Sequence, residues 1–265
     1  MSDGKSMMLE CCNVSIRYRT GDVRNVGLKE VLMQKLTGRR QAKDFWADRD
    51  VSFALQKGDM LGIIGSNGAG KSTLLKATVG ALPLAAGDVV FGGESLAGKS
   101  VEERVRMGIS YLRQTDNIFP GQTVEENLQL AGMSLTKTAY AAARDEMLAL
   151  FDFLKPKLGQ RAGSLSGGQR QALALAMVFM RPQKLYLLDE PSAGLSPKAA
   201  KDIIERVRCF AKENGKRAVL MVEHRLDLLA WIDRAVFLSQ GKVRSETSDA
   251  GQFLDADWLA KNYFE

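Results

Sequence analysis

The sequence predicts an α/β fold, in which helices pack on a largely parallel β-sheet. Four apolar runs are too short for helices and lack the polar alternation of half-exposed strands, so they are typical of strands buried on both faces. These runs cover residues 60–64, 109–112, 185–188 and 218–222. Helix-forming segments separate the runs, and a polar segment follows each of them.

The helical segments are predicted from composition and position. Residues 73–79 continue from a glycine-rich loop, 139–154 are rich in alanine and leucine, 169–180 are strong helix formers, and 199–212 carry mixed charge. The stretch 115–163 contains no comparable apolar run, so we expect a mostly helical insertion there.

Composition places the chain among ordinary globular proteins, with 265 residues, 45% apolar and 26% charged. Cys11, Cys12 and Cys209 lack the CxxC spacing of zinc and redox sites, and we expect reduced thiols in a cytosolic protein. The first residues contain no apolar run of signal-peptide length, and no run of ~18 apolar residues occurs elsewhere, so we expect any membrane role to come through partners. The net charge of +6 favours anionic neighbours but does not choose among them.

The polar segments after the apolar runs point to one site. The first run leads into a glycine-rich loop, the second into Gln114, the third into Asp189 and Glu190, and the fourth into His224. In an open parallel sheet, ligands bind at the carboxyl ends of the strands. We therefore expect four strand ends to meet at one polar site.

The first of these segments matches the phosphate-binding pattern GxxxxGK[ST]. Its backbone N–H groups and the start of the next helix would bind phosphates, Lys71 would bridge the β- and γ-phosphates, and the Ser72 hydroxyl would bind Mg²⁺. The pattern predicts a P-loop NTPase (RecA-like) core that binds ATP and Mg²⁺; a plain glycine-rich turn is the alternative. The phosphate loop comprises Gly65, Ser66, Asn67, Gly68, Ala69, Gly70, Lys71, Ser72 and Thr73.

Two carboxylates follow the third apolar run. Phosphoryl transfer needs a metal ligand and a group that activates water, and we assign Asp189 to the metal and Glu190 to the water. The alternative is a pair of acidic residues that cap the turn before Pro191.

The segment 165–170 reads LSGGQR and opens a predicted helix, with Ser166 at the N-cap and Gly167 and Gly168 allowing close approach to an anion. The order along the chain is a phosphate loop, Gln114, LSGGQ, a strand ending in Asp-Glu, and a lone histidine. This order resembles that of the ABC ATPase family, and the resemblance covers nearly the whole chain.

The resemblance implies a head-to-tail dimer, either a homodimer or a heterodimer with a related ATPase. ATP on the phosphate loop of one chain would be covered by Ser166, Gly167, Gly168 and Gln169 of the other. The resemblance assigns Gln114 to a lid that senses Mg²⁺ and contacts the membrane partner, and it assigns His224 to the γ-phosphate. Implied partners are integral membrane permease subunits at the cytoplasmic face of the inner or plasma membrane, and no nucleic acid is expected.

Two further positions follow from the resemblance. Tyr18 is similar to the aromatic residue on which adenine stacks in the family, although a core or edge-strand tyrosine remains an alternative. Residues 191–196 match the dimer-contact loop of the family, but Ser196 stands where aspartate is common.

We expect one domain over residues 1–265. Its nucleotide-binding core would comprise 1–114 and 164–245, its helical subdomain 115–163, and its C-terminal tail 246–265.

The kind of ABC protein is indicated by two competing resemblances. From residue 85 onward, the segments 108–120, 123–128, 191–197 and 253–263 resemble branched-chain amino-acid importer ATPases, which favours hydrophobic amino-acid uptake. The extra segment 22–47 is similar to ATPases of polysaccharide and lipid-linked glycan exporters, and its amphipathic helix would rest on lipid, a partner or its own domain. A soluble non-transport ABC ATPase is a third reading, which one phosphate loop and the lack of sustained heptads disfavour.

Overall fold

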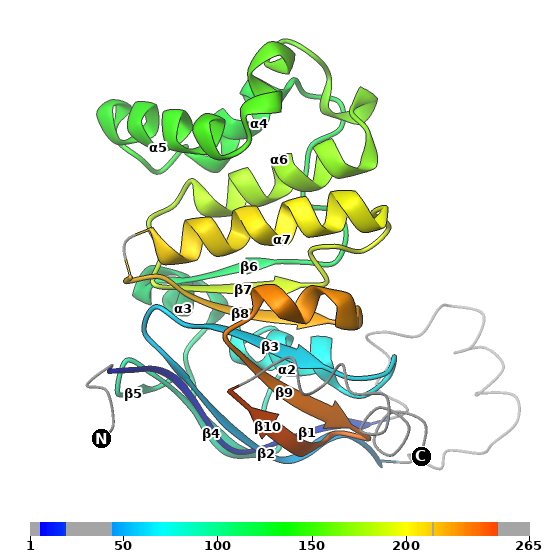
Figure 1. Ribbon diagram of the computed structural model, residues 1–265. Coiled ribbons are helices and arrows are strands. Elements are labelled where there is room, and N and C mark those ends of the chain that lie inside the picture. Colours follow the sequence, from blue (N-terminus) through cyan, green and yellow to red (C-terminus); the bar gives the residue numbers. More distant parts are fainter. Residues whose placement is uncertain (1–5, 20–43, 214, 249–265) are drawn as a thin grey trace, which may run out of the picture.

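The computed structural model of the protein describes residues 6–19, 44–213 and 215–248. Its main sheet has six strands in the order β10-β9-β3-β8-β7-β6 (Figure 1). The pairs from β9 to β6 are parallel, and β10 pairs antiparallel with β9. The strands are β3 (Met60–Ile64), β6 (Ile109–Leu112), β7 (Leu185–Asp189), β8 (Ala218–Glu223), β9 (Arg234–Ser239) and β10 (Lys242–Thr247).

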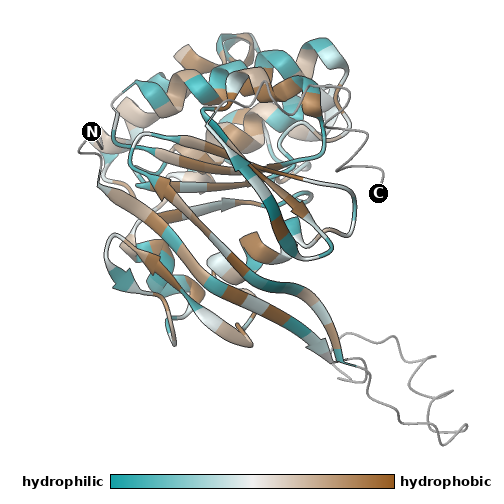
Figure 2. Ribbon diagram, turned by 60° about the horizontal axis from the view of Figure 1, so that its bottom comes forward, coloured by the Kyte–Doolittle hydropathy of each residue, from teal (hydrophilic) through white to brown (hydrophobic). Residues whose placement is uncertain are grey.

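The four predicted strands are confirmed in this sheet. Every residue of β3, β7 and β8 is buried, as expected for strands covered on both faces. The strands β9 and β10 were not predicted from the sequence. Figure 2 shows the strands at the centre of the molecule as mostly hydrophobic.

A second, antiparallel sheet has the order β2-β1-β4-β5 and was also not predicted. Its strands are β1 (Met7–Arg19), β2 (Asp44–Gln56), β4 (Ala86–Phe91) and β5 (Glu94–Ser95). The β1–β2 register shifts at several points, so no single alternation of polar and apolar residues runs along these strands. A separate apolar core lies between this sheet and the main sheet.

The predicted helical segments are present with shifted ends, and one further helix, α3, was not predicted. The prediction 139–154 is wrong at its C-terminus: α5 stops at Leu150 because Phe151 leaves helical geometry, and a 3₁₀ turn with Pro156 follows. The α-helices are α2 (Lys71–Thr78), α3 (Val101–Met107), α4 (Val124–Ala131), α5 (Lys137–Leu150), α6 (Gly167–Phe179) and α7 (Pro197–Lys212). The 3₁₀ helices are η2 (Asp152–Lys157), η3 (Ala162–Ser164) and η4 (Leu226–Trp231).

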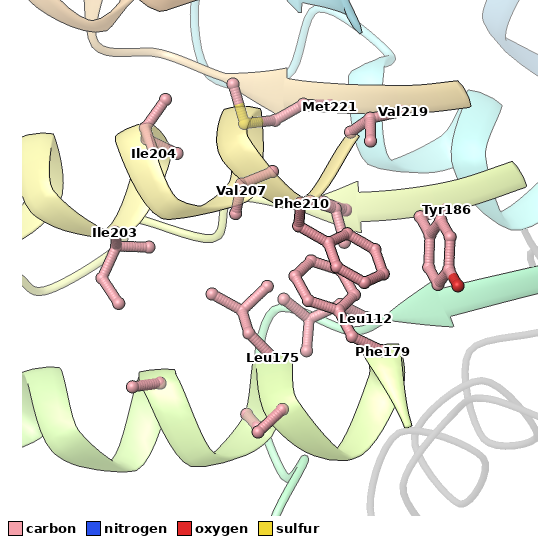
Figure 3. Packing of buried hydrophobic residues seen from close by; sticks show 14 of the residues in the cluster. Leu112, Leu175, Phe179, Tyr186, Ile203, Ile204, Val207, Phe210, Val219 and Met221 are labelled. Carbon is pink, nitrogen blue, oxygen red and sulfur yellow. The ribbon is translucent and has the colours of Figure 1, made fainter. Parts of the chain in front are cut away.

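An aromatic cluster fixes α6 and α7 on one face of the main sheet (Figure 3). Phe179 of α6 stacks on Phe210 of α7 with ring centroids 3.9 Å apart, and Tyr186 of β7 meets Phe210 edge-on. The Tyr186 hydroxyl donates to the Arg181 carbonyl, so its polar end is satisfied although the residue is buried.

The stretch 115–163 contains α4, α5 and η2, and η3 begins at its end. Figure 1 shows α4 and α5 beyond α6, on the side away from the sheet. The helix α4 packs against α6. Among the described residues, no helix combines the length and apolar character needed to cross a bilayer.

Candidate active site

The phosphate loop lies between the end of β3 and the start of α2. Gly70 has φ of 105°, and a Cβ atom there would lie 2.0 Å from Asp48 Oδ1. A Cβ atom on Gly65 would lie 2.0 Å from the Leu238 carbonyl oxygen. The loop conformation therefore requires glycine at both positions.

The start of α2 is open to an anion. Its N-cap is Gly70, and no side chain caps its first N–H groups. Gly241, in the turn between β9 and β10, donates its N–H to the Ala69 carbonyl and thereby anchors the loop. Uncapped N–H groups at a helix start, together with the helix dipole, form a binding site for phosphate.

Lys71 is buried in the loop, where its Nζ atom donates to the carbonyls of Gly65 at 2.8 Å and Ser66 at 2.9 Å. Burial lowers the pKa of Lys71, while the charges of Glu190, Asp189 and Glu223 oppose that change. Lys71 lines the cavity above the loop and is the only cationic residue among the described residues that line it.

Asp189 joins three elements of the site. Its Oδ1 atom accepts from Ser72 Oγ at 2.7 Å, and its Oδ2 atom accepts from Tyr111 Oη at 3.1 Å. Tyr111, on β6, was not predicted as a site residue. The hydroxyl and carboxylate oxygens of Ser72 and Asp189 are hard donors, so this pair fits Mg²⁺.

Glu190 follows β7 in a left-handed conformation, with φ of 49°, which is uncommon for a residue other than glycine. Its Oε2 atom accepts from Gln114 Nε2 at 2.8 Å and lies 3.7 Å from His224 Nδ1. Residues after β6, β7 and β8 thus come together around one carboxylate, because the three strands are neighbours in the sheet.

Tyr18 lies beside the phosphate loop. It is on β1, 39% exposed, and its hydroxyl is 3.4 Å from Thr73 Oγ1. Both residues line a cavity of about 250 Å³. Its walls are formed by Tyr18, Phe45, Ala47, Asn67, Gly68, Ala69, Gly70, Lys71, Ser72, Thr73 and Glu190.

The LSGGQ segment forms the start of α6, with Ser166 at the N-cap as predicted. The Gln169 N–H donates to Ser166 Oγ, and Gln169 Oε1 accepts from the Ser166 N–H in a capping box. None of residues 166–169 lines the phosphate-loop cavity. Gly167 instead lines a second cavity of about 300 Å³ with Gln114 and Gly194.

Two buried carboxyl groups near the site were missed by the sequence reading. Glu223 ends β8, its Oε1 atom accepts from the Ser192 N–H at 3.0 Å, and burial raises its pKa. Asp48 on β2 lies beneath Gly70, and burial raises its pKa to about 7. Neither oxygen of Asp48 has a hydrogen-bond partner among the described residues. Glu223 could have been predicted as a site residue because it directly precedes His224. No feature of the sequence pointed to Asp48.

Comparison with known proteins agrees with this geometry. Residues 49–193 match the family described as "ABC transporter". The high-affinity branched-chain amino acid transport ATP-binding protein BraG of Pseudomonas aeruginosa is 38% identical over 194 residues, which are 73% of this chain and 83% of that protein. The probable branched-chain amino acid transport ATP-binding protein LivF of Archaeoglobus fulgidus is 37% identical over 195 residues, 73% of this chain and 82% of that protein.

Among solved structures, the ADP conformation of MJ1267, an ATP-binding cassette of an ABC transporter, superposes with a TM-score of 0.78 at 25% identity. The superposition covers 98% of this chain and 99% of that one. The chain therefore belongs to the ABC transporter family and is an ATP-binding and hydrolysing subunit that powers a transporter of that family.

Proposed function

We propose that the chain hydrolyses Mg²⁺-bound ATP to drive uptake of branched-chain or other hydrophobic amino acids through membrane permease subunits. The observation that carries the catalytic part is the cluster at the strand ends. There Ser72 Oγ donates to Asp189 Oδ1 at 2.7 Å. Glu190 Oε2 lies 2.8 Å from Gln114 Nε2 and 3.7 Å from His224 Nδ1.

The proposal divides the site by charge. The phosphate loop and Lys71 would bind the triphosphate, and Ser72 and Asp189 would hold Mg²⁺. Gln114, whose side-chain amide donates to Glu190, is assigned as a further ligand. The metal supplies positive charge that stabilises the phosphate oxygens during phosphoryl transfer.

Glu190 is the general base of the proposal. Its carboxylate is mostly buried, and Gln114 fixes one of its oxygens by a hydrogen bond of 2.8 Å. A fixed carboxylate beside the phosphate loop orients a water molecule and accepts its proton. The proposal assigns His224, whose Nδ1 atom is 3.7 Å from the same carboxylate, to the γ-phosphate.

A second subunit completes the proposed site. Residues 166–169 do not line the phosphate-loop cavity of their own chain, yet the start of α6 offers glycine N–H groups and a serine hydroxyl to an anion. The proposal places these groups on ATP held by another copy or by a related ATPase, head to tail. Ser196, the N-cap of α7, stands in the loop that would meet the partner.

The transported substrate is proposed from the relatives named above, which act in branched-chain amino acid transport. The alternative, an exporter of polysaccharide or lipid-linked glycan, depends on segment 22–47, and residues 22–43 lie outside the described residues. The chain would sit peripherally at the cytoplasmic face of the inner or plasma membrane, with no nucleic-acid partner.

A transport assay tests this proposal. The chain is purified from detergent-solubilised membranes with its membrane partners, reconstituted in vesicles, and assayed for ATP-dependent accumulation of labelled leucine. We expect leucine uptake that the Glu190→Gln variant abolishes. ATPase activity that responds to a lipid-linked glycan and not to leucine would favour the exporter, and co-purification of ribosomes or DNA would contradict a transport role.

A further inference from the structure

An exposed phenylalanine lies across from Tyr18 at the nucleotide site. Phe45 is 62% exposed on β2, and it is the direct partner of Tyr18 in the antiparallel β1–β2 pair. Side chains of directly opposed residues lie on the same face of a sheet. Both rings accordingly line the cavity above the phosphate loop.

The next residue on β2 has a different environment. Trp46 does not line the cavity, and its ring is covered by two guanidinium groups, with Arg17 at 5.5 Å and Arg49 at 4.9 Å from its centroid. Successive side chains of a strand point to opposite faces, so Phe45 and Trp46 are separated by the sheet. Trp46 already has partners on its face, whereas Phe45 presents its ring to the cavity.

The walls of the cavity differ in chemistry. The charged residues that line it are Lys71, from the phosphate loop, and Glu190, from the end of β7. The β1–β2 pair contributes the two aromatic rings instead. A nucleotide has the same division, because its phosphates are charged and its base is a flat aromatic surface.

We propose that Phe45 is a second aromatic contact for the nucleobase of ATP, beside Tyr18. The inference rests on ATP binding by this family and does not depend on which substrate is transported. Two rings enclose more of the base than one does, and base–aromatic stacking is a substantial part of affinity in other nucleotide sites.

A phenylalanine at this position would also affect which nucleobases bind well. A phenyl ring has no hydrogen-bonding group, so it contacts the face of a base and does not read its edge. Adenine and guanine should therefore gain similarly from Phe45. The smaller pyrimidine bases should gain less.

The test compares two neighbouring variants with two probes. Binding of ATP and of inorganic tripolyphosphate, which has no base, is measured by titration calorimetry for the wild type, Phe45→Ala and Trp46→Ala. We expect Phe45→Ala to weaken ATP binding about fivefold or more and to leave tripolyphosphate binding unchanged. Trp46→Ala should change neither, and Phe45→Trp should restore ATP binding because it keeps an aromatic face.

Three outcomes would overturn the proposal. One is an unchanged ATP affinity in Phe45→Ala. Another is an equal loss for ATP and tripolyphosphate, which would mean a distorted phosphate loop. The third is an equal loss in Trp46→Ala, which would mean a general effect on β2. Thermal unfolding of each variant checks that the fold is kept, so that a binding loss is assigned to the ring.

Discussion

The starts of α2 and α6 both have the character of anion sites, but they differ in how they are completed. The α2 start has Gly70 at its N-cap and no side-chain cap, and it faces the cavity with Lys71 and Ser72. The α6 start is capped by its own Ser166 and Gln169 and does not line that cavity. One chain thus brings together the phosphate loop, the proposed metal ligands and the proposed base. The start of α6, the second anion site, does not line the cavity of its own chain.

The catalytic groups of the site and the groups that would close it are therefore separate parts of the chain. The strand-end residues are joined to one another within the chain, as Ser72 is to Asp189 and Gln114 to Glu190. No such bond joins the α6 start to the phosphate loop among the described residues. Substitutions in the first group should change hydrolysis within a chain, and substitutions in the second should change assembly.

The largest effect is expected for Lys71→Ala. The variant removes the buried ammonium group that would bind the phosphates of ATP. Steady-state ATP hydrolysis should therefore fall by at least about two orders of magnitude, and ATP binding should weaken. Lys76→Ala is the matched control, since Lys76 lies exposed on the same helix outside the cavity. Full turnover in a folded Lys71→Ala protein would refute the assignment of the loop.

Glu190→Gln should lower hydrolysis by about two or more orders of magnitude while ATP binding survives. The amide oxygen of glutamine can still accept the hydrogen bond from Gln114, so the shape of the site is kept. Blocked hydrolysis should then hold two chains together, seen as an ATP-dependent shift from monomer to dimer in size-exclusion chromatography. Hydrolysis at the wild-type rate would show that Glu190 is not the base.

Ser166→Arg, combined with Glu190→Gln, should abolish the ATP-dependent dimer but leave ATP binding by the monomer within about twofold. The added side chain would fill the space that the partner's phosphates need at the α6 start. Loss of an N-cap also costs about 1 kcal/mol, so the control must lose a cap as well. Thr136→Arg removes the N-cap of α5, outside the cavity, and should keep the dimer. A dimer that persists in Ser166→Arg would contradict the head-to-tail arrangement.

The smallest effect concerns stability beneath the α2 start. Asp48 is buried with a folded pKa of about 7, above the usual value of about 4, so the folded state holds its proton more tightly than the unfolded state. Its contribution to stability is therefore highest below about pH 4 and declines as pH rises to about 7. Asp48→Asn removes this decline.

Urea unfolding at pH 5 and pH 8 measures the Asp48 effect. We expect Asp48→Asn to gain stability relative to the wild type on going from pH 5 to pH 8. The exposed Asp50→Asn, on the same strand, is the control and should show little change. An equal pH dependence in Asp48→Asn and the wild type would show that Asp48 does not titrate in this range.

The sequence predicted best those strands whose two faces are both buried. Runs such as 60–64 and 218–222 are apolar throughout because both faces are buried, so they were recognisable without a partner strand. The β1–β2–β4 sheet was missed because register shifts break its alternation. Tyr111 and Asp48 were missed for a related reason, since each gains its role from a residue distant in sequence, Asp189 and Gly70 respectively.

The phosphate loop, the LSGGQ helix start and the strand-end carboxylates could be predicted from the sequence, because the groups within each motif are neighbours along the chain. The sequence also predicted that Gln114, Glu190 and His224 meet at one site. Their specific contacts with the Glu190 carboxylate, and the position of Phe45 opposite Tyr18, became visible only in the folded chain. These pairings follow from strand order and register, which join segments tens of residues apart. Periodicity within one segment carries no information about them.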